Sequence, residues 1–202
     1  DHTSGLPDYF LNGKIDRALF RDRGREWTTR DSFRYVGKPI FPAGKGWYYS
    51  NTNYALLALI AEAVDDRPLS EQLRSRFLDP LGLDHTYEQI DERPVGPIAR
   101  GYRVTGSVSR PVYTELSDGS KIMPFTSVVT AAPGAGSMAA SSTDVARWAR
   151  ALYGGEALPR ETVRAMVADA RNTARFRPRV GYGLGVQVTT LDGRPALGHS
   201  GR

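Results

Sequence analysis

Residues Gly44-Lys45-Gly46-Trp47-Tyr48-Tyr49-Ser50-Asn51-Thr52-Asn53-Tyr54 form the stretch around which we expect the rest of the fold to be organised. A phenol and a carboxamide, Tyr49 and Asn51, stand at the end of a loop marked by proline and glycine. The most apolar helical pattern of the chain follows directly. Loops held by a rigid scaffold often carry functional groups. The alternative is that these aromatic residues only form a packed plug over the helix. The rest of the sequence is needed to distinguish a functional site from such a structural cluster.

The helix that follows this stretch is predicted from Asn53 onward. Its apolar side chains recur at helical spacing and cover more than one face, which predicts a largely buried helix. They are Leu56, Leu57, Leu59, Ile60, Ala63 and Val64. We expect Asn51 or Thr52 to cap its amino terminus and Pro68 to follow its end. Tyr49 and Asn51 would then be held next to a rigid helix end.

Capping and turn residues divide much of the remaining chain into short elements. Further helices are predicted to begin at Ser70, at Ser141 and near Pro159. Short pieces near residues 102–104 and 111–116 have strand character. Two histidines and two large aromatic residues are expected to have structural roles. His2 should brace a turn, His85 should lie on the surface, and Tyr54 and Trp148 should belong to the core.

The last residues of the chain predict a β-hairpin. Residues 182–191 and 194–201 have strand character and flank Asp192-Gly193, a dipeptide that accepts the positive φ angles of a type I′ turn. A two-residue turn fixes the register of the strands. The expected cross-strand pairs are Leu191 with Arg194, Val186 with His199, and Gly185 with Ser200. A glycine opposite Ser200 would leave this edge open to a ligand.

Length and composition indicate one globular domain, or one domain with a subdomain. The chain has 202 residues, 40% of them hydrophobic, and no cysteine. Disulfides and thiolate metal sites are therefore excluded, and its three histidines are too widely separated in sequence to predict a metal site. Residues 17–38 are rich in arginine, but acidic residues are interspersed and no nucleic-acid motif is present, so a solvated face is favoured. No long apolar run or signal peptide is evident.

A search for a nucleophile finds no complete serine hydrolase motif. No lysine of the chain has a serine three residues before it, so Ser-x-x-Lys is absent. Gly198-His199-Ser200-Gly201 continues with Arg202, so Gly-x-Ser-x-Gly is absent too. His199 and Ser200 are neighbours on a predicted strand and point to opposite faces, which excludes a catalytic pair. Paired carboxylates of the glycosidase type stay open, but no spacing favours any pair.

Several short motifs are spread across the whole chain. They are His2-Thr3-Ser4-Gly5-Leu6-Pro7-Asp8-Tyr9, Phe41-Pro42-Ala43-Gly44, Trp47 to Tyr54, Pro80-Leu81-Gly82-Leu83, Ser141-Ser142-Thr143-Asp144, Tyr182-Gly183-Leu184-Gly185 and Gly198-His199-Ser200-Gly201. In residues and in order they resemble the class C β-lactamase and D-alanyl-D-alanine carboxypeptidase family of serine acyltransferases. The greatest likeness is to secreted DD-carboxypeptidases of the penicillin-binding type.

The resemblance implies an α/β (α+β) fold of the β-lactamase/transpeptidase type, with an antiparallel sheet flanked by helices and a mostly helical subdomain. Residues 1–202 would form a single incomplete domain. A largely helical and loop part, about residues 1–180, would carry the Tyr-x-Asn motif. The hairpin, about residues 181–202, would carry the His-Ser-Gly motif. The resemblance also implies that the segment with Ser-x-x-Lys, and further strands, lie outside this chain.

The resemblance also implies a role for each matched residue. Tyr49, Asn51 and His199 would be catalytic: the phenol carries a proton, the amide holds the substrate's carbonyl, and His199 lies across the cleft as another donor. Ser200 and Gly201 would bind the substrate. Free tyrosine, with a pKa of about 10, is a poor base at neutral pH, so Tyr49 would need nearby cations.

Arg202 departs from the family, which usually has a small residue at this position. By the family pattern its backbone N–H would belong to the oxyanion hole. Its guanidinium would either pair with a substrate carboxylate or narrow the cleft. The substrate class is therefore less defined by the sequence than the reaction class.

The function implied is acyl transfer through an acyl-enzyme, most simply by a D-alanyl-D-alanine carboxypeptidase. The substrate would be a D-Ala-D-Ala peptide, a β-lactam or an ester. The alternatives are a carboxylesterase or class C β-lactamase of the same fold, and a non-catalytic penicillin-binding or sensor domain. No cofactor, metal or nucleic acid is implied, and a monomer outside the cytoplasm, either secreted or in the cell envelope, is expected.

Overall fold

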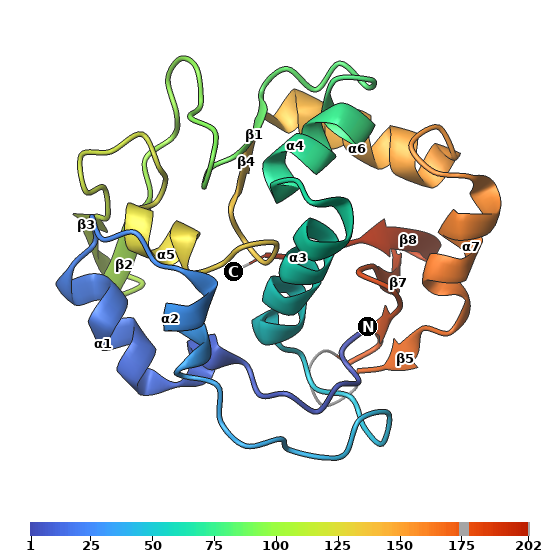
Figure 1. Ribbon diagram of the computed structural model, residues 1–202, viewed down its shortest axis with the longest axis horizontal. Coiled ribbons are helices and arrows are strands. Elements are labelled where there is room, and N and C mark those ends of the chain that lie inside the picture. Colours follow the sequence, from blue (N-terminus) through green and yellow to red (C-terminus); the bar gives the residue numbers. More distant parts are fainter. Residues whose placement is uncertain (174–177, 202) are drawn as a thin grey trace.

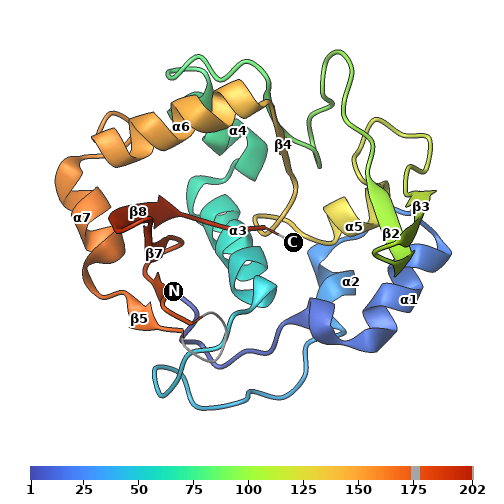
Figure 2. The ribbon, with the colours of Figure 1, turned by 180° about the vertical axis from the view of Figure 1, so that it is seen from behind.

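A long central helix organises the computed structural model, which describes residues 1–173 and 178–201 (Figure 1). The helices are η1 (Tyr9–Leu11), α1 (Gly13–Arg21), α2 (Thr29–Phe33), α3 (Asn51–Asp65), α4 (Leu69–Leu73), the π-helical turn η2 (Arg74–Leu78), α5 (Thr126–Thr130), α6 (Ser142–Gly154) and α7 (Arg160–Ala168). The strands are β1 (Thr86–Glu88), β2 (Tyr102–Ser107), β3 (Arg110–Glu115), β4 (Met138–Ala140), β5 (Arg171–Asn172), β6 (Gly181–Tyr182), β7 (Gln187–Leu191) and β8 (Arg194–Gly198). Viewed from either side, α3 separates α1, α2 and α5 from α6, α7 and the last four strands (Figures 1 and 2).

Strand pairing among the described residues is antiparallel. β1 pairs with β4, β2 pairs with β3, and the last four strands form a sheet in the order β5-β6-β7-β8. The predicted strand pieces near residues 102–104 and 111–116 are the two arms of the β2–β3 hairpin. Helices around a small antiparallel sheet, next to a more helical part, confirm the predicted α/β class.

The predicted turn between the last two strands is confirmed. Asp192 and Gly193 have φ angles of 49° and 76°, and Leu191 pairs with Arg194 as the turn requires. The ladder ends, however, at Gln187 opposite Gly198. The predicted pairs of Val186 with His199 and of Gly185 with Ser200 are therefore not part of it.

One continuous strand over residues 182–191 was the wrong prediction, because the chain turns at residues 183–186. Gly183 N donates to Val186 O at 2.8 Å, and Leu184 N donates to Met166 O of α7 at 2.8 Å. A Cβ atom on Gly183 would lie only 1.9 Å from Met166 O. The close approach of α7 thus requires a glycine at position 183. The turn at residues 183–186 brings β6 back to pair with β7.

The main hydrophobic core lies on the α1 side of α3. Its buried members come from η1, α1, α3, the loop before α2 and the two residues that flank α5. They are Tyr9, Ile15, Leu19, Trp27, Ala55, Phe125 and Ala131. The Tyr9 hydroxyl donates to Ala131 O at 2.7 Å, so the polar tip of this buried ring is satisfied. This core fixes the first residues of the chain relative to α3.

The prediction that α3 is largely buried is wrong for the described chain. Its fully buried residues are the small or polar Thr52, Asn53, Ala55 and Ala58. Its larger apolar residues face outward, with Leu57 51%, Ile60 56% and Val64 82% exposed. The described residues pack against one face of α3 and leave its larger apolar side chains uncovered.

No helix among the described residues is long and apolar enough to cross a membrane.

Two predicted helix starts are also corrected. The N-cap of α3 is Ser50 rather than Asn51 or Thr52, because these two side chains bond to the first residues of the chain instead. The N-cap of α4 is Pro68 rather than Ser70. The predicted cap of α6 is confirmed, since the Ser141 hydroxyl accepts from Asp144 N at 3.1 Å.

Candidate active site

The first residues of the chain lie along residues 48–53 and hold the loop that carries the Tyr-x-Asn motif. Tyr48 N donates to His2 O at 2.9 Å. The Thr52 hydroxyl donates to Pro7 O at 2.7 Å. A backbone N–H at one end of the loop and a side-chain hydroxyl at the other are thus bonded to a segment far away in the sequence, which limits the motion of the side chains between them.

Asn51 is anchored from the same segment. Its amide Nδ2 donates to Asp8 Oδ2 at 2.7 Å, and Asn51 is half-buried at the start of α3. Burial raises the pKa of Asp8, while hydrogen bonds from Phe10 and Asn51 oppose the change. The contact uses one of the two amide hydrogens of Asn51. Its predicted role at a substrate carbonyl thus starts from a side chain with a fixed orientation.

Tyr49 lies in a cluster of aromatic rings. Its ring centroid is 4.3 Å from that of His2, 6.1 Å from that of His199 and 6.2 Å from that of Tyr182. The two predicted catalytic rings, from the α3 entrance and from the end of the hairpin, are therefore brought together. His2 is fully buried, whereas Tyr49 is half-buried and His199 is exposed.

Hydroxyl groups link His199 to the interior. Tyr182 Oη lies 2.9 Å from His199 Nε2 and 3.5 Å from Tyr54 Oη. Burial raises the pKa of Tyr182, and Tyr54 and Tyr49 raise it further. Burial also raises the pKa of Tyr54, although the contact with Tyr182 opposes the change. Both phenols therefore stay protonated at neutral pH and can donate hydrogen bonds but do not act as bases.

The predicted substrate-binding residues lie just beyond the end of β8. The Ser200 hydroxyl exchanges hydrogen bonds with the Gln187 carboxamide at 3.1 and 3.2 Å, which fixes its position beside the sheet. Gly201 is exposed. Arg202 lies outside the described residues.

Several residues of this cluster were not predicted as site residues. His2 was expected to brace a turn, but its ring accepts a hydrogen bond from Ser50 N at the start of α3 and packs on Tyr49. Tyr54 was assigned to the core, yet it is half-buried and reaches Tyr182. Tyr182 belongs to the Tyr182-Gly183-Leu184-Gly185 motif, but the sequence analysis predicted no role for its phenol. His85 is exposed, as predicted.

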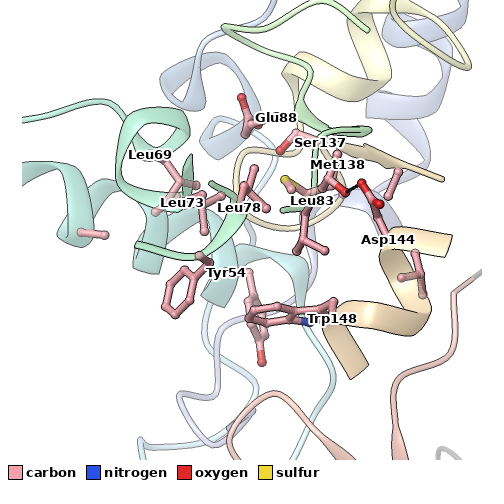
Figure 3. A pocket seen from close by; sticks show the side chains of 18 of the residues that line it. Tyr54, Leu69, Leu73, Leu78, Leu83, Glu88, Ser137, Met138, Asp144 and Trp148 are labelled. Carbon is pink, nitrogen blue, oxygen red and sulfur yellow. Dashed lines mark hydrogen bonds between the residues drawn. The ribbon is translucent and has the colours of Figure 1, made fainter. Parts of the chain in front are cut away.

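An apolar pocket of about 620 Å³ adjoins the cluster and shares Tyr54 with it. Figure 3 shows its wall, to which Leu69 and Leu73 of α4, Leu78 of η2 and Trp148 of α6 contribute. Leu57 of α3, which is half-exposed, also lines it. Among residues 1–173 and 178–201, no group of three or more histidine, aspartate or glutamate side chains is arranged to hold a metal ion.

Comparison with protein families identifies the chain. The model of the family described as Beta-lactamase matches residues 1–202. The chain belongs to the beta-lactamase family. Beta-lactamase family proteins of this fold are serine hydrolases and include penicillin-binding proteins and D-amino acid amidases. Penicillin-binding protein 4* of Bacillus subtilis (strain 168) is 24% identical over 208 residues, which cover 100% of this chain and 44% of that protein.

Solved structures of the beta-lactamase family agree. A D-stereospecific amidohydrolase from Streptomyces sp. superposes with a TM-score of 0.81 and 26% identity over 98% of this chain and 58% of that one. A D-amino acid amidase from Ochrobactrum anthropi SV3, solved with L-phenylalanine amide, gives a TM-score of 0.75 and 26% identity over 98% of this chain and 55% of that one. The chain thus spans about half the length of these three relatives.

Lowering the pH is expected to destabilise the fold through His2. Burial lowers the pKa of His2 to about 3, with lesser contributions from the amino terminus and His199. The unfolded chain has a histidine pKa of about 6.5, so it binds a proton that the fold excludes as the pH falls from about 6.5 to about 3. The loss should reach at most about 5 kcal/mol at pH 3.

Urea unfolding between pH 7 and pH 4.5 measures the first part of this loss, up to about 3 kcal/mol. Asp8 and Glu88 act in the opposite sense, because burial raises their pKa values and the fold gains stability when they are protonated. The difference between the unmodified chain and His2→Phe therefore isolates His2, and His85→Phe serves as the exposed control. Equal pH slopes for the unmodified chain and His2→Phe would contradict the expectation.

Proposed function

We propose that residues 1–202 belong to a serine acyl hydrolase that cleaves amide bonds next to D-configured residues through an acyl-enzyme, with D-alanyl-D-alanine carboxypeptidase as the first candidate activity. The observation that carries the proposal is the 6.1 Å separation of the Tyr49 and His199 rings, which come from the family's second and third motifs. Acyl transfer needs a side chain that carries the proton and hydrogen-bond donors placed at the same site, and we propose that Tyr49 and His199 supply them.

The proposed chemistry assigns the proton to Tyr49. A serine oxygen bonds to the substrate's carbonyl carbon, and the serine proton passes through Tyr49 to the leaving amine as the C–N bond breaks. Water then adds to the acyl carbon and the serine leaves with a proton. Tyr182 and Tyr54 are unsuited to act as the base, because burial raises the pKa of both phenols. In this scheme Asn51 holds the carbonyl, and Ser200 and Gly201 accommodate the far end of the substrate.

The nucleophile in this proposal comes from sequence outside residues 1–202. The printed sequence contains no Ser-x-x-Lys, and the relatives are about twice as long as the matched part. The apolar pocket beside Tyr54 and the exposed apolar side chains of α3 supply surface that a further apolar segment would bury. We propose that such a segment brings the serine and its lysine to Tyr49.

A D-amino acid amidase is the second candidate activity. It is favoured by the structural similarity to the D-amino acid amidase from Ochrobactrum anthropi SV3, at a TM-score of 0.75 and 26% identity. The two activities differ at the substrate end, because a carboxypeptidase must bind a free carboxylate. Hydrolysis rates on a set of substrates would distinguish the two activities from each other and from an esterase. The set is a peptide ending in D-Ala-D-Ala as the free acid and as the amide, D-phenylalanine amide, the L-isomers of these compounds, and a simple ester.

Residues 1–202 alone are expected to be catalytically inert, because they lack the nucleophile. A fluorescent penicillin should not label the isolated chain covalently but should label the longer protein that we propose contains it. Labelling of the isolated chain that is lost on heat denaturation would contradict this expectation. Reversible binding by the longer protein without an acyl-enzyme would instead favour the non-catalytic binding domain.

A further inference from the structure

Two hydrogen-bond donors from other residues approach the same ring nitrogen of His2. Ser50 N and Asn53 Nδ2 each lie 3.1 Å from His2 Nδ1. A backbone N–H can only donate, so Nδ1 is the acceptor. The Asn53 amide is itself fixed, because its Oδ1 accepts from the Ser4 hydroxyl at 2.5 Å. The neutral ring must then carry its proton on Nε2.

Aromatic side chains also surround the His2 ring. Ring centroids of Tyr49, Tyr182, Tyr54 and Trp47 lie 4.3, 4.8, 5.4 and 5.6 Å from that of His2. His2 is 0% exposed, and its Nε2 has no nitrogen or oxygen partner among the described residues. A cation here would lose its hydration without gaining a carboxylate, so the environment favours the neutral ring.

The two features act on the same short piece of chain. Nδ1 fixes the backbone N–H of Ser50, the residue that follows Tyr49, and the ring face supports the Tyr49 ring. Ser50 is fully buried and is the N-cap of α3, yet its own side chain makes no capping bond. His2 therefore supplies an acceptor for the N-cap N–H of Ser50, a contact that the side chain at the third helical position makes in a capping box.

We propose that His2 is a positioning residue for Tyr49. In its neutral form, with the proton on Nε2, the His2 ring fixes the Ser50 backbone and supports the Tyr49 ring. The proposal rests on the proposed function of Tyr49 in proton transfer. His2 does not touch the reacting atoms in this scheme. A displacement of the phenol by about 1 Å is enough to slow a reaction about a hundredfold, so the position of the Tyr49 ring affects the reaction rate.

Two substitutions separate the acceptor from the ring. His2→Asn keeps an acceptor near the Nδ1 position and removes the ring, whereas His2→Phe keeps a ring and removes the acceptor. Hydrogen exchange of the Ser50 amide in residues 1–202 should accelerate at least about tenfold in His2→Phe and stay within about threefold in His2→Asn. The pair His85→Asn and His85→Phe is the matched control at an exposed histidine.

Kinetics of the longer protein provide the second readout. His2→Phe should lower kcat about 10- to 100-fold with KM within about threefold, and His2→Asn should restore part of kcat. Nitrogen NMR should show the proton on Nε2 at pH 7. A proton on Nδ1, or an asparagine variant as impaired as the phenylalanine variant, would overturn the proposal. An inactive unsubstituted protein would refute the proposed function, and Ser50 exchange would still decide the role of His2.

Discussion

Tyr49→Phe is expected to lower the acylation rate of the longer protein by about 10² to 10⁴, the usual contribution of a positioned proton-transfer group. The substitution removes one oxygen and keeps the ring, so the contacts of this ring with His2 and Tyr182 are preserved. The fold should therefore keep its stability. Stopped-flow measurement of β-lactam acylation, together with thermal unfolding, distinguishes loss of the proton carrier from loss of structure.

Tyr48→Phe is the matched control for this prediction. Tyr48 is the preceding residue and is half-buried like Tyr49, but its described attachment is the backbone bond to His2 O, which the substitution leaves intact. Acylation by the Tyr48 variant should remain within about twofold of the unsubstituted protein. Unchanged acylation in Tyr49→Phe would refute the role proposed for Tyr49.

Gly5→Ala is expected to reduce the free energy of unfolding by at least about 3 kcal/mol. Gly5 has a φ angle of +79°, a conformation that alanine rarely adopts. The added Cβ would lie 2.0 Å from Phe41 O. Gly5 O also accepts from Ile40 N at 2.8 Å, so any shift that relieves the clash disturbs the pairing that holds the first residues of the chain.

Gly13→Ala is the control for this effect. Gly13 begins α1, and no atom lies within 4 Å of a Cβ added there. The substitution should be neutral or stabilise the chain by up to about 1 kcal/mol, because alanine has the higher helix propensity. Urea unfolding of residues 1–202 measures both variants. Equal midpoints would show that the segment around Gly5 adapts without cost.

Local signals account for the parts of the fold that the sequence predicted well. The Ser141 cap and the Asp192-Gly193 turn depend on contacts within a few residues, and both appear in the structure. The strand prediction over residues 182–191 failed because Met166 O, from another element, contacts Leu184 and leaves no space for a side chain at position 183. No local pattern contains this information.

The burial of α3 shows the same limit. Helical spacing of leucine and isoleucine predicts which faces are apolar, but not which of them another segment covers. The described residues pack on Ala55 and Ala58 and leave Leu57 and Ile60 half-exposed. Small residues permit close approach of neighbouring elements, a property that an average hydrophobicity does not reveal.

The sequence by itself determined the family, the fold class and the positions of the Tyr-x-Asn and His-Ser-Gly motifs, because these depend on residue identity and order along the chain. Only the tertiary structure decided that Tyr49 lies against His2, that His199 meets the Tyr182 hydroxyl, and that Tyr54 joins this cluster. These rings come from three segments that are far apart in the sequence, at residue 2, residues 49–54 and residues 182–199. Their contacts arise from packing of distant segments, which local propensity does not encode.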